Sequence, residues 1–308
     1  MLGQQGNDRP VFPVRPYRKH YPLILPAFHV SKLLQTRTSR AIFKMVMNKK
    51  IGIAGLGAIG SAVARALTTG NGIEAMTLHA VSETVPKPEF KVPNVSFAEL
   101  ADQCDLVIEC LPPHVVPLLT KEVLSKNREM VLISSSALLL HPEIMDHLRT
   151  STGRIIVPSG ALAGIDAVRA LSQVGIKSAR IATTKKPAGF AGAPFIVKNN
   201  IDLSKIKSRQ KLFSGNAFEA AHGFPANVNV AVTLSLAGIG PEKTEVEIWA
   251  DPEARGNTHE IHVTSAYSTV NARIENQPDP ANPRSSVLAA QSIVALLRGM
   301  TEPLVVRG

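Results

Sequence analysis

The sequence predicts an α/β protein with a doubly wound parallel sheet and a second, α+β domain. Three observations predict this. Apolar strand patterns alternate with helical patterns from residue 49 to residue 157, a glycine motif joins the first strand to the first helix, and strand patterns predominate from residue 177. Apolar strands separated by helices are typical of parallel sheets covered on both faces.

The glycine motif is Gly55-Leu-Gly-Ala-Ile-Gly60, which follows the predicted strand 50–54 and opens the predicted helix 59–69. In a Gly-x-Gly-x-x-Gly turn the first glycine permits the bend, the second lets the backbone approach a pyrophosphate, and the third lets helix and strand pack closely. The helix N-terminus then faces the phosphates. An ordinary strand-to-helix turn is the competing interpretation. We expect a Rossmann-type dinucleotide site at Gly55, Gly57, Ala58, Ile59 and Gly60.

The remaining elements are predicted in order along the chain. In the first domain, strands are expected at 75–81, 105–110, 130–133 and 154–157, with helices at 115–125 and 142–148. In the second domain, a strand at 177–184 and a loop-rich segment at 185–205 precede a small-residue helix at 226–237 and strands at 244–250, 258–264 and 267–274. The short spacing of those last three strands indicates antiparallel hairpins.

The end of the chain is predicted to return to the first domain. Pro278, Pro280 and Pro283 indicate a linker, and a helix is expected at 285–297. We therefore expect a dinucleotide-binding domain at 48–162 plus 285–308, and a substrate-binding catalytic domain at 163–284.

The net charge of +10 belongs mainly to one segment of the chain. Residues 1–50 carry ten Lys or Arg and one acid, a charge of +9, which leaves +1 for residues 51–308. A nearly neutral body argues against nucleic-acid binding. We expect 1–47 to be a disordered or misassigned basic extension, and a targeting peptide is the alternative.

Composition also indicates the cellular compartment of the protein. No apolar run is long enough to span a membrane, and the two cysteines, Cys104 and Cys110, cannot form a disulfide framework. These features predict a cytoplasmic protein without a membrane partner.

One candidate proton carrier lies on the predicted strand 258–264. Side chains alternate along a strand, so His259, Ile261 and Val263 share one face. A histidine at the end of an apolar face is placed to meet a ligand, and it titrates near neutral pH. A half-buried histidine bonded to a backbone carbonyl is the alternative.

Two asparagines, Asn227 and Asn229, open the predicted helix 226–237. Asparagine at a helix start commonly caps it, which is the simple interpretation of Asn227. The pair would otherwise supply neutral hydrogen bonds to a carboxylate or to a nicotinamide amide.

Ligand-binding candidates also follow three predicted strands, because α/β sheets bind ligands beyond the strands' carboxyl ends. These are Glu109-Cys110, Ser134-Ser135-Ser136 and the small-residue stretch 158–166. Cys110 is placed to lie near a nicotinamide, although a buried inert thiol is the simpler interpretation. Glu143 with His147 and the isolated His222 do not make a metal site.

Several of these segments together resemble the L-aspartate dehydrogenase family. The resemblance runs from about Lys49 to about Arg298. The matching segments are Gly-Leu-Gly-Ala-Ile-Gly at 55–60, Glu-Cys at 109–110, Ser-Ser-Ala at 135–137, Pro-Ser-Gly-Ala-Leu-Ala-Gly-Ile-Asp at 158–166, Phe-Pro-Ala-Asn-Val-Asn-Val-Ala at 224–231, Ala-Asp-Pro at 250–252, Asn-Thr-His-Glu-Ile at 257–261 and Glu-Asn-Gln-Pro-Asp-Pro-Ala-Asn-Pro at 275–283.

The resemblance implies oxidation of L-aspartate by NAD or NADP to iminoaspartate, which hydrolyses to oxaloacetate and ammonia or enters NAD biosynthesis. It implies that His259 is catalytic and that Ala163 and Asn229 lie at the cofactor, where we also place Cys110 and Ser135. A homodimer is expected. The chain departs from the usual dinucleotide pattern at Leu78–Ser82, which lacks an acid for the ribose, and Glu83 lies one position further on.

Two other functions remain open from the sequence. One is an oxidoreductase of another substrate with the same two-domain plan, such as a homoserine-dehydrogenase-like protein, because fold alone does not fix the substrate. The other is a non-catalytic dinucleotide sensor, against which the presence of His259 and Asn229 argues.

Overall fold

The computed structural model describes residues 48–70, 72–279 and 282–306, which belong to one compact unit. The expected basic extension at 1–47 lies outside the described residues. Within the described part, no helix is long and apolar enough to cross a lipid bilayer.

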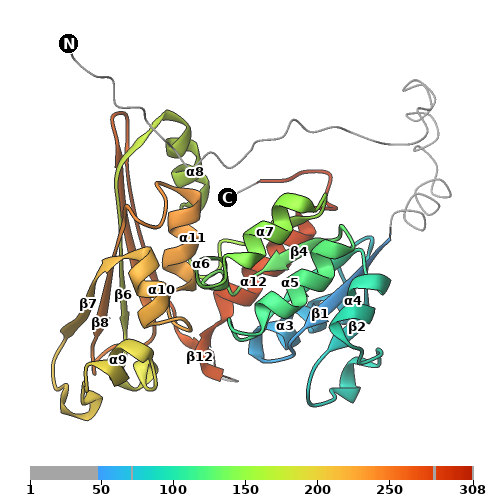
Figure 1. Cartoon of the computed structure of the whole chain (residues 1–308), viewed down its shortest axis with the longest axis horizontal. Helices are drawn as coiled ribbons and strands as arrows, with labels where there is room; N and C mark the ends of the chain where they lie inside the picture. The colour runs from blue at the N-terminus through green and yellow to red at the C-terminus, as the bar shows by residue number, and fades with distance from the viewer. Residues whose placement is uncertain (1–47, 71, 280–281, 307–308) are drawn as a thin grey trace. The chain divides into compact units, whose positions relative to one another are not determined.

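The first sheet, sheet A, is the predicted doubly wound parallel sheet. Its strands are β1 (Lys49–Ala54), β2 (Met76–Ser82), β3 (Leu106–Glu109), β4 (Glu129–Leu132) and β5 (Arg154–Ile156). They are parallel and lie in the order β2-β1-β3-β4-β5 (Figure 1). The chain leaves β1 toward β2 and later returns to β1's other side with β3. The carboxyl ends of β1 and β3 therefore flank a topological switch point, where such sheets bind ligands.

Helices cover both faces of sheet A, as the apolar strands require. One face packs against α3 (Ala58–Thr68) and α12 (Val287–Arg298), which also contact each other. The other face packs against α4 (Phe97–Gln103), α5 (Val116–Ser125) and α7 (Glu143–Thr150). Ile51, Ile53 and Ile108 in the strands are fully buried.

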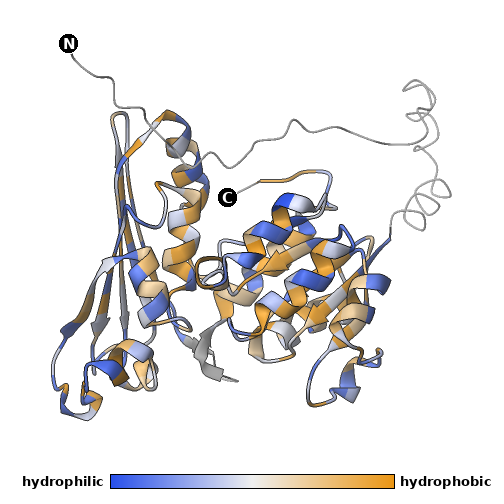
Figure 2. Cartoon of the chain, in the orientation of Figure 1, coloured by the Kyte–Doolittle hydropathy of each residue, from blue (hydrophilic) through white to orange (hydrophobic). Residues whose placement is uncertain are grey.

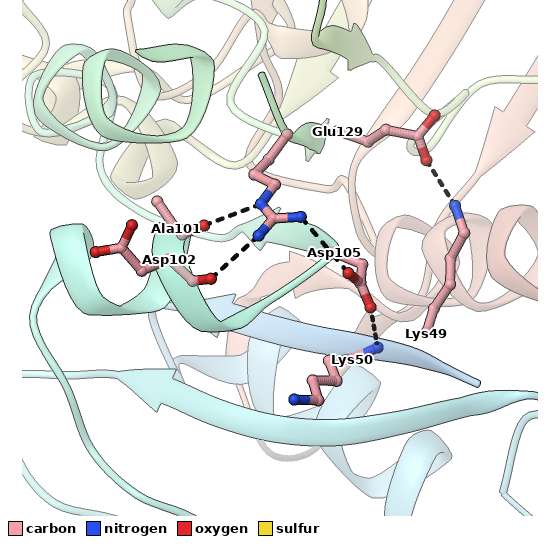
Figure 3. A network of polar contacts seen from close by, with 7 residues as sticks. Lys49, Lys50, Ala101, Asp102, Asp105 and Glu129 are labelled. Atoms are coloured by element: carbon pink, nitrogen blue, oxygen red, sulfur yellow. Dashed lines mark hydrogen bonds and ion pairs between the residues drawn. The ribbon is translucent and has the colours of Figure 1, made fainter. Parts of the chain in front are cut away.

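Charged groups fix the amino edge of the sheet, opposite the glycine turn. Lys49 Nζ lies 2.7 Å from Glu129 Oε2, and the Lys50 backbone amide donates to Asp105 Oδ2 at 2.9 Å (Figure 3). Arg128 donates to the carbonyls of Ala101 and Asp102. These partly exposed contacts contribute little free energy singly, but they join the starts of β1 and β4, the start of β1 to the residue before β3, and the residue before β4 to the end of α4.

The second sheet, sheet B, corrects the prediction of consecutive hairpins. It comprises β6 (Ile176–Lys185), β7 (Gln210–Asn216), β8 (Thr244–Ala250), β9 (Thr258–Ser265) and β10 (Thr269–Glu275) in the order β10-β9-β6-β8-β7. β9 and β10 form an antiparallel hairpin, but β8 and β9 do not pair. β6 lies between them, parallel to β8 and antiparallel to β9. Short spacing wrongly predicted a hairpin between β8 and β9, because β6, the strand that separates them, comes from far upstream in the sequence.

One face of sheet B packs against α8 (Ile165–Val174), α10 (Ala217–Gly223) and α11 (Asn229–Ala237), shown on the same side of the sheet in Figure 1. In Figure 2, α11 is predominantly hydrophobic, as suits a helix in a core. The other face carries charged side chains, among them Arg180, Glu247 and Glu260.

Several elements were absent from the sequence prediction. They are β7, α4, α8 and α10, together with the short α6 (Ala137–Leu140), α9 (Pro194–Lys198), η1 (Pro88–Phe90), η2 (Pro187–Phe190) and η3 (Leu203–Lys205). Both α4 and α10 begin with a capping box, at Ser96/Glu99 and Asn216/Glu219, a start signal that is visible in the sequence. The expected proline linker instead contains the paired strands β11 (Pro278–Asp279) and β12 (Asn282–Ser286).

Candidate active site

The three glycines of the turn differ in what their surroundings allow. Gly55 adopts φ +88°, a conformation that side chains disfavour. A Cβ at Gly60 would lie 1.9 Å from the carbonyl oxygen of Gly55, so helix and strand approach too closely for any side chain. A Cβ at Gly57 would meet nothing within 4 Å and would point into open space. The open space over Gly57 is where a pyrophosphate would lie.

The N-terminus of α3 fits an anion. Its N-cap is Gly57, which has no side chain to cap the helix, and Ala58 and Ile59 form its first turn. The first amides of a helix have no intrahelical acceptors, and the helix dipole is positive at this end. An uncapped N-terminus beside the open space over Gly57 therefore fits a dinucleotide pyrophosphate.

Glu83 is an acid that lies one position beyond the place where the usual dinucleotide pattern has its ribose-binding residue. It follows β2 directly, and its carboxylate accepts a hydrogen bond from the backbone amide of Leu56, inside the glycine turn, at 2.5 Å. Although partial burial acts to raise its pKa, hydrogen bonds from the amides of Leu56 and Thr84 outweigh burial and lower it. A carboxylate therefore lies beside the glycine turn, despite the unfavourable spacing in the sequence.

Cys110 and Glu109 pack behind the glycine turn. The Cys110 carbonyl oxygen would lie 2.4 Å from a Cβ at Gly55. Burial, together with the nearby Glu109 carboxylate, raises the pKa of the Cys110 thiol, which favours the inert thiol over a reactive one. Glu109 is fully buried and accepts hydrogen bonds from the amides of Leu111, Ile133 and Ser134, which ties the end of β3 to that of β4.

The loop after β4 is joined to α11 and to the segment just before it by four hydrogen bonds. Ser135 Oγ donates to the Asn229 carbonyl at 2.8 Å and lies 3.1 Å from Thr233 Oγ1. The Ser136 amide donates to Asn229 Oδ1 at 3.1 Å, and Ser136 Oγ donates to the Pro225 carbonyl at 2.8 Å. The loop at the carboxyl end of sheet A thus contacts the helix that packs on sheet B.

His259 lies on the helix-covered face of sheet B and is 4% exposed. It is paired in register with Thr183 on β6, and its Nδ1 lies 3.1 Å from Thr183 Oγ1. Burial, and then the positive charge of Lys185, lower the pKa of His259 to about 3. The imidazole is therefore neutral at physiological pH, which is the form that accepts a proton.

Lys185 lies in the same polar end of that face and was missed in the sequence. It ends β6, two residues after Thr183, so both side chains project from the same face. Its Nζ donates to Asn227 Oδ1 at 3.0 Å. Asn227 is therefore not the helix cap that was expected, because α11 begins at Asn229 after Val228. The period-two pattern Ile181, Thr183, Lys185 was the signal available in the sequence.

The remaining candidate residues make none of the contacts described above or do not form a set of metal ligands. Ala163 is half-buried in the turn before α8, and among the described residues no hydrogen bond joins it to the other predicted site residues. No cluster of metal-ligating side chains occurs in the described part of the chain. A cavity of about 510 Å³ is lined in part by Thr258 and Glu260. These two residues alternate with His259 along β9, so they lie on the face of the strand opposite to His259.

These features define a class of protein: a dinucleotide-dependent oxidoreductase in which a Rossmann-type domain carries the glycine turn and a second domain supplies a buried histidine. Residues 166–300 match the family model described as aspartate dehydrogenase, C-terminal. Residues 29–136 match the NAD-binding domain of D-isomer-specific 2-hydroxyacid dehydrogenases.

Curated relatives name the particular family. The chain is 42% identical to L-aspartate dehydrogenase 3 of Bordetella bronchiseptica, over 82% of this chain and 96% of that protein. It is 41% identical to L-aspartate dehydrogenase of Bradyrhizobium diazoefficiens, over 81% and 90%. The crystal structure of aspartate dehydrogenase from Thermotoga maritima superposes with a TM-score of 0.65 at 25% identity, covering 84% of this chain and 99% of that one. The chain belongs to the L-aspartate dehydrogenase family.

Proposed function

We propose that this chain oxidises L-aspartate to iminoaspartate with NAD or NADP, and that the product hydrolyses to oxaloacetate and ammonia or feeds NAD biosynthesis. The observation that carries the proposal is the neutral, buried His259 beside Lys185, on a domain joined to the dinucleotide edge through Asn229 and Ser136. A base, a cation and a dinucleotide edge are what oxidation of an anionic amino acid needs. The family membership supplies the substrate.

In this mechanism the Cα–H bond of aspartate breaks as a hydride, the amine loses a proton, and the C=N bond forms. NAD or NADP, when bound, supplies the hydride acceptor. His259 accepts the amine proton, directly or through a water molecule. Asn229, held by Ser136, fixes the second domain against the dinucleotide edge, which keeps the reacting carbons in line.

The low pKa of His259 belongs to a site without substrate. Its causes are burial and the charge of Lys185. A dicarboxylate entering the site brings negative charge, which offsets the lysine and raises the pKa of the imidazole. The histidine becomes a stronger base when the substrate arrives.

We propose that NAD is preferred to NADP. Glu83 holds a carboxylate against the Leu56 amide at the end of β2, where the adenosine ribose of a dinucleotide lies in this fold. A carboxylate there accepts hydrogen bonds from the ribose hydroxyls and repels a 2′-phosphate.

We also propose the domain limits 48–162 plus 285–308 and 163–284, a cytoplasmic homodimer and the absence of a nucleic-acid partner. We propose cofactor-binding roles for Gly55, Gly57, Ala58, Ile59, Gly60, Cys110, Ser135, Ala163 and Asn229. Separate hydrophobic cores beneath the two sheets support the domain limits. The two free thiols, Cys104 and Cys110, suit a reducing compartment. Light scattering of the purified protein tests the dimer.

The test of function is aspartate-dependent reduction of NAD or NADP, followed by absorbance at the wavelength of the reduced nicotinamide. We expect turnover with L-aspartate and none with L-homoserine. Turnover with homoserine instead would support the rival dehydrogenase, and cofactor binding without turnover on either substrate would support a sensor.

A further inference from the structure

Lys185 has no counter-ion among the residues that the structure describes. Its side chain projects from the helix-covered face of sheet B, two residues from Thr183, which contacts His259. Pro187–Phe190 (η2) packs along its aliphatic stem, since a Cβ at Gly189 would lie 3.7 Å from Lys185 Cβ. The ammonium is thereby held at the polar end of an otherwise apolar face.

Its polar contacts leave most of its hydrogen-bonding capacity unused. An ammonium has three N–H donors. Among the described residues, Nζ makes one hydrogen bond, to Asn227 Oδ1 at 3.0 Å, and no carboxylate of the described chain lies within ion-pair distance of it. Burial lowers the pKa of Lys185 to about 8, so it is still mostly protonated at pH 7.

A partly buried cation without a paired anion is costly to the folded state. The same ammonium is also close enough to His259 to contribute to lowering the pKa of the imidazole. Both unfavourable interactions are relieved if an anion binds between Lys185 and His259 during function. Asn227 gives one neutral hydrogen bond that orients the ammonium without neutralising it.

We propose that Lys185 binds a carboxylate of the substrate and makes the site selective for dicarboxylates, with Asn227 as its positioning residue. This inference rests on the proposed function, because aspartate is the dicarboxylate that His259 would act on. A fixed ammonium attracts carboxylates and disfavours amino acids whose side chains offer no negative charge.

The test measures binding of succinate, a dicarboxylate without an amine, to the NAD-bound protein by calorimetry. In Lys185→Met the affinity should fall by about 10–100-fold, the loss expected for one charged hydrogen bond in a partly buried site. Lys185→Arg should recover part of that loss. The matched control is Lys186→Met, which removes the same charge from an exposed neighbour and should leave succinate binding unchanged.

Folding and cofactor binding are followed in the same variants. We expect Lys185→Met to keep its affinity for NAD and to unfold at a midpoint no lower than that of the wild type, since an unpaired, partly buried charge has been replaced by an apolar side chain of similar length. Unchanged succinate affinity in a folded Lys185→Met protein would overturn the proposal. So would a fall in kcat with unchanged KM for aspartate, which would make Lys185 a proton carrier instead.

The succinate measurement needs no turnover, so the two proposals fail separately. If the wild-type protein does not oxidise aspartate but loses succinate binding in Lys185→Met, the proposed function is wrong and the carboxylate site stands. If wild-type turnover is observed and succinate binding does not depend on Lys185, the inference alone is wrong.

Discussion

The backbone amide of Ser136 donates a hydrogen bond to the side-chain carbonyl of Asn229, 93 residues further along the chain, at 3.1 Å. Ser136 follows β4 of sheet A, and Asn229 is the first residue of α11, which packs on sheet B. Two residues earlier, Asn227 accepts a hydrogen bond from Lys185. The Asn-Val-Asn segment therefore connects the dinucleotide edge to the group of side chains around His259.

Asn229→Ala should destabilise the protein by about 1–3 kcal/mol, because the buried Ser136 amide is left without its acceptor. NAD affinity should fall as well, since the loop after β4 loses one of its hydrogen bonds to α11. Urea unfolding and NAD titration measure the two effects. Asn229→Asp keeps an acceptor oxygen and should recover most of the stability, and equal destabilisation by both substitutions would show that the acceptor is unimportant.

His259→Ala should lower kcat for aspartate by about 10²–10⁴-fold, as expected when a general base is removed. NAD affinity should change little, because His259 contacts Thr183 rather than the glycine turn. The matched control is His262→Ala, on the same strand but on its exposed face. Near-normal turnover of His259→Ala, measured by steady-state kinetics, would refute the assignment.

Gly57→Val should fold normally and bind NAD on the order of 10–100-fold more weakly. Its φ of −66° is open to any residue, and a Cβ there meets no protein atom, so the added side chain fills only the space for the pyrophosphate. Gly60→Ala is the contrasting variant, since its Cβ would clash with the Gly55 carbonyl and lower stability. Unaltered NAD binding by folded Gly57→Val would show that the glycine motif is only a turn and does not bind the cofactor.

Glu83→Ser should raise the ratio of kcat/KM with NADP to kcat/KM with NAD by roughly 10–100-fold, because the substitution removes the negative charge that opposes a 2′-phosphate. Glu89→Ser, at an exposed glutamate in η1, is the control and should leave the ratio unchanged. The ratio is measured with aspartate saturating, and no change in it would contradict the role given to Glu83.

Glu247→Gln should lower stability at neutral pH by roughly 1–3 kcal/mol. Burial alone would raise the pKa of Glu247, but hydrogen bonds from Arg180, Lys211 and Trp249 outweigh it and lower the pKa to about 2. A lowered carboxyl pKa stabilises the fold above the ordinary value of about 4.5, and that stabilisation is lost as pH falls toward 2.

The difference between wild type and Glu247→Gln should therefore shrink as the pH falls from about 4.5 to about 2. Urea unfolding at a series of pH values measures it. Glu245→Gln, at an exposed carboxylate on the same strand, should show a much smaller difference throughout. A pH-independent difference for Glu247→Gln would contradict the ion-pair explanation.

The local sequence was sufficient to predict those features of the structure that depend only on neighbouring residues. The glycine turn needs a bend at Gly55 and close packing at Gly60, and both requirements arise within a few residues of chain. The inward position of His259 follows from side-chain alternation along one strand. The sheet A strands were found because their apolar runs are bounded by clear turn signals.

The prediction failed where partners come from distant segments. Spacing favoured a hairpin between β8 and β9, but β6 pairs with both and separates them. Asn227 was expected to cap a helix, yet its side chain meets Lys185, 42 residues away. Glu83 was judged too far along the chain, although its side chain reaches Leu56.

The sequence by itself indicated the dinucleotide edge and the inward position of His259, because glycine backbone freedom and strand alternation are properties of contiguous residues. The family and the catalytic role expected of His259 came from the resemblance of several segments to one family. Only the tertiary structure decided that Lys185 lies near His259 with no carboxylate partner in the described part of the chain, and that Asn229 contacts the loop after β4. The physical reason is that hydrogen bonds, burial and Coulombic interactions depend on distance in space, which strand order and helix packing set and which separation along the chain does not encode.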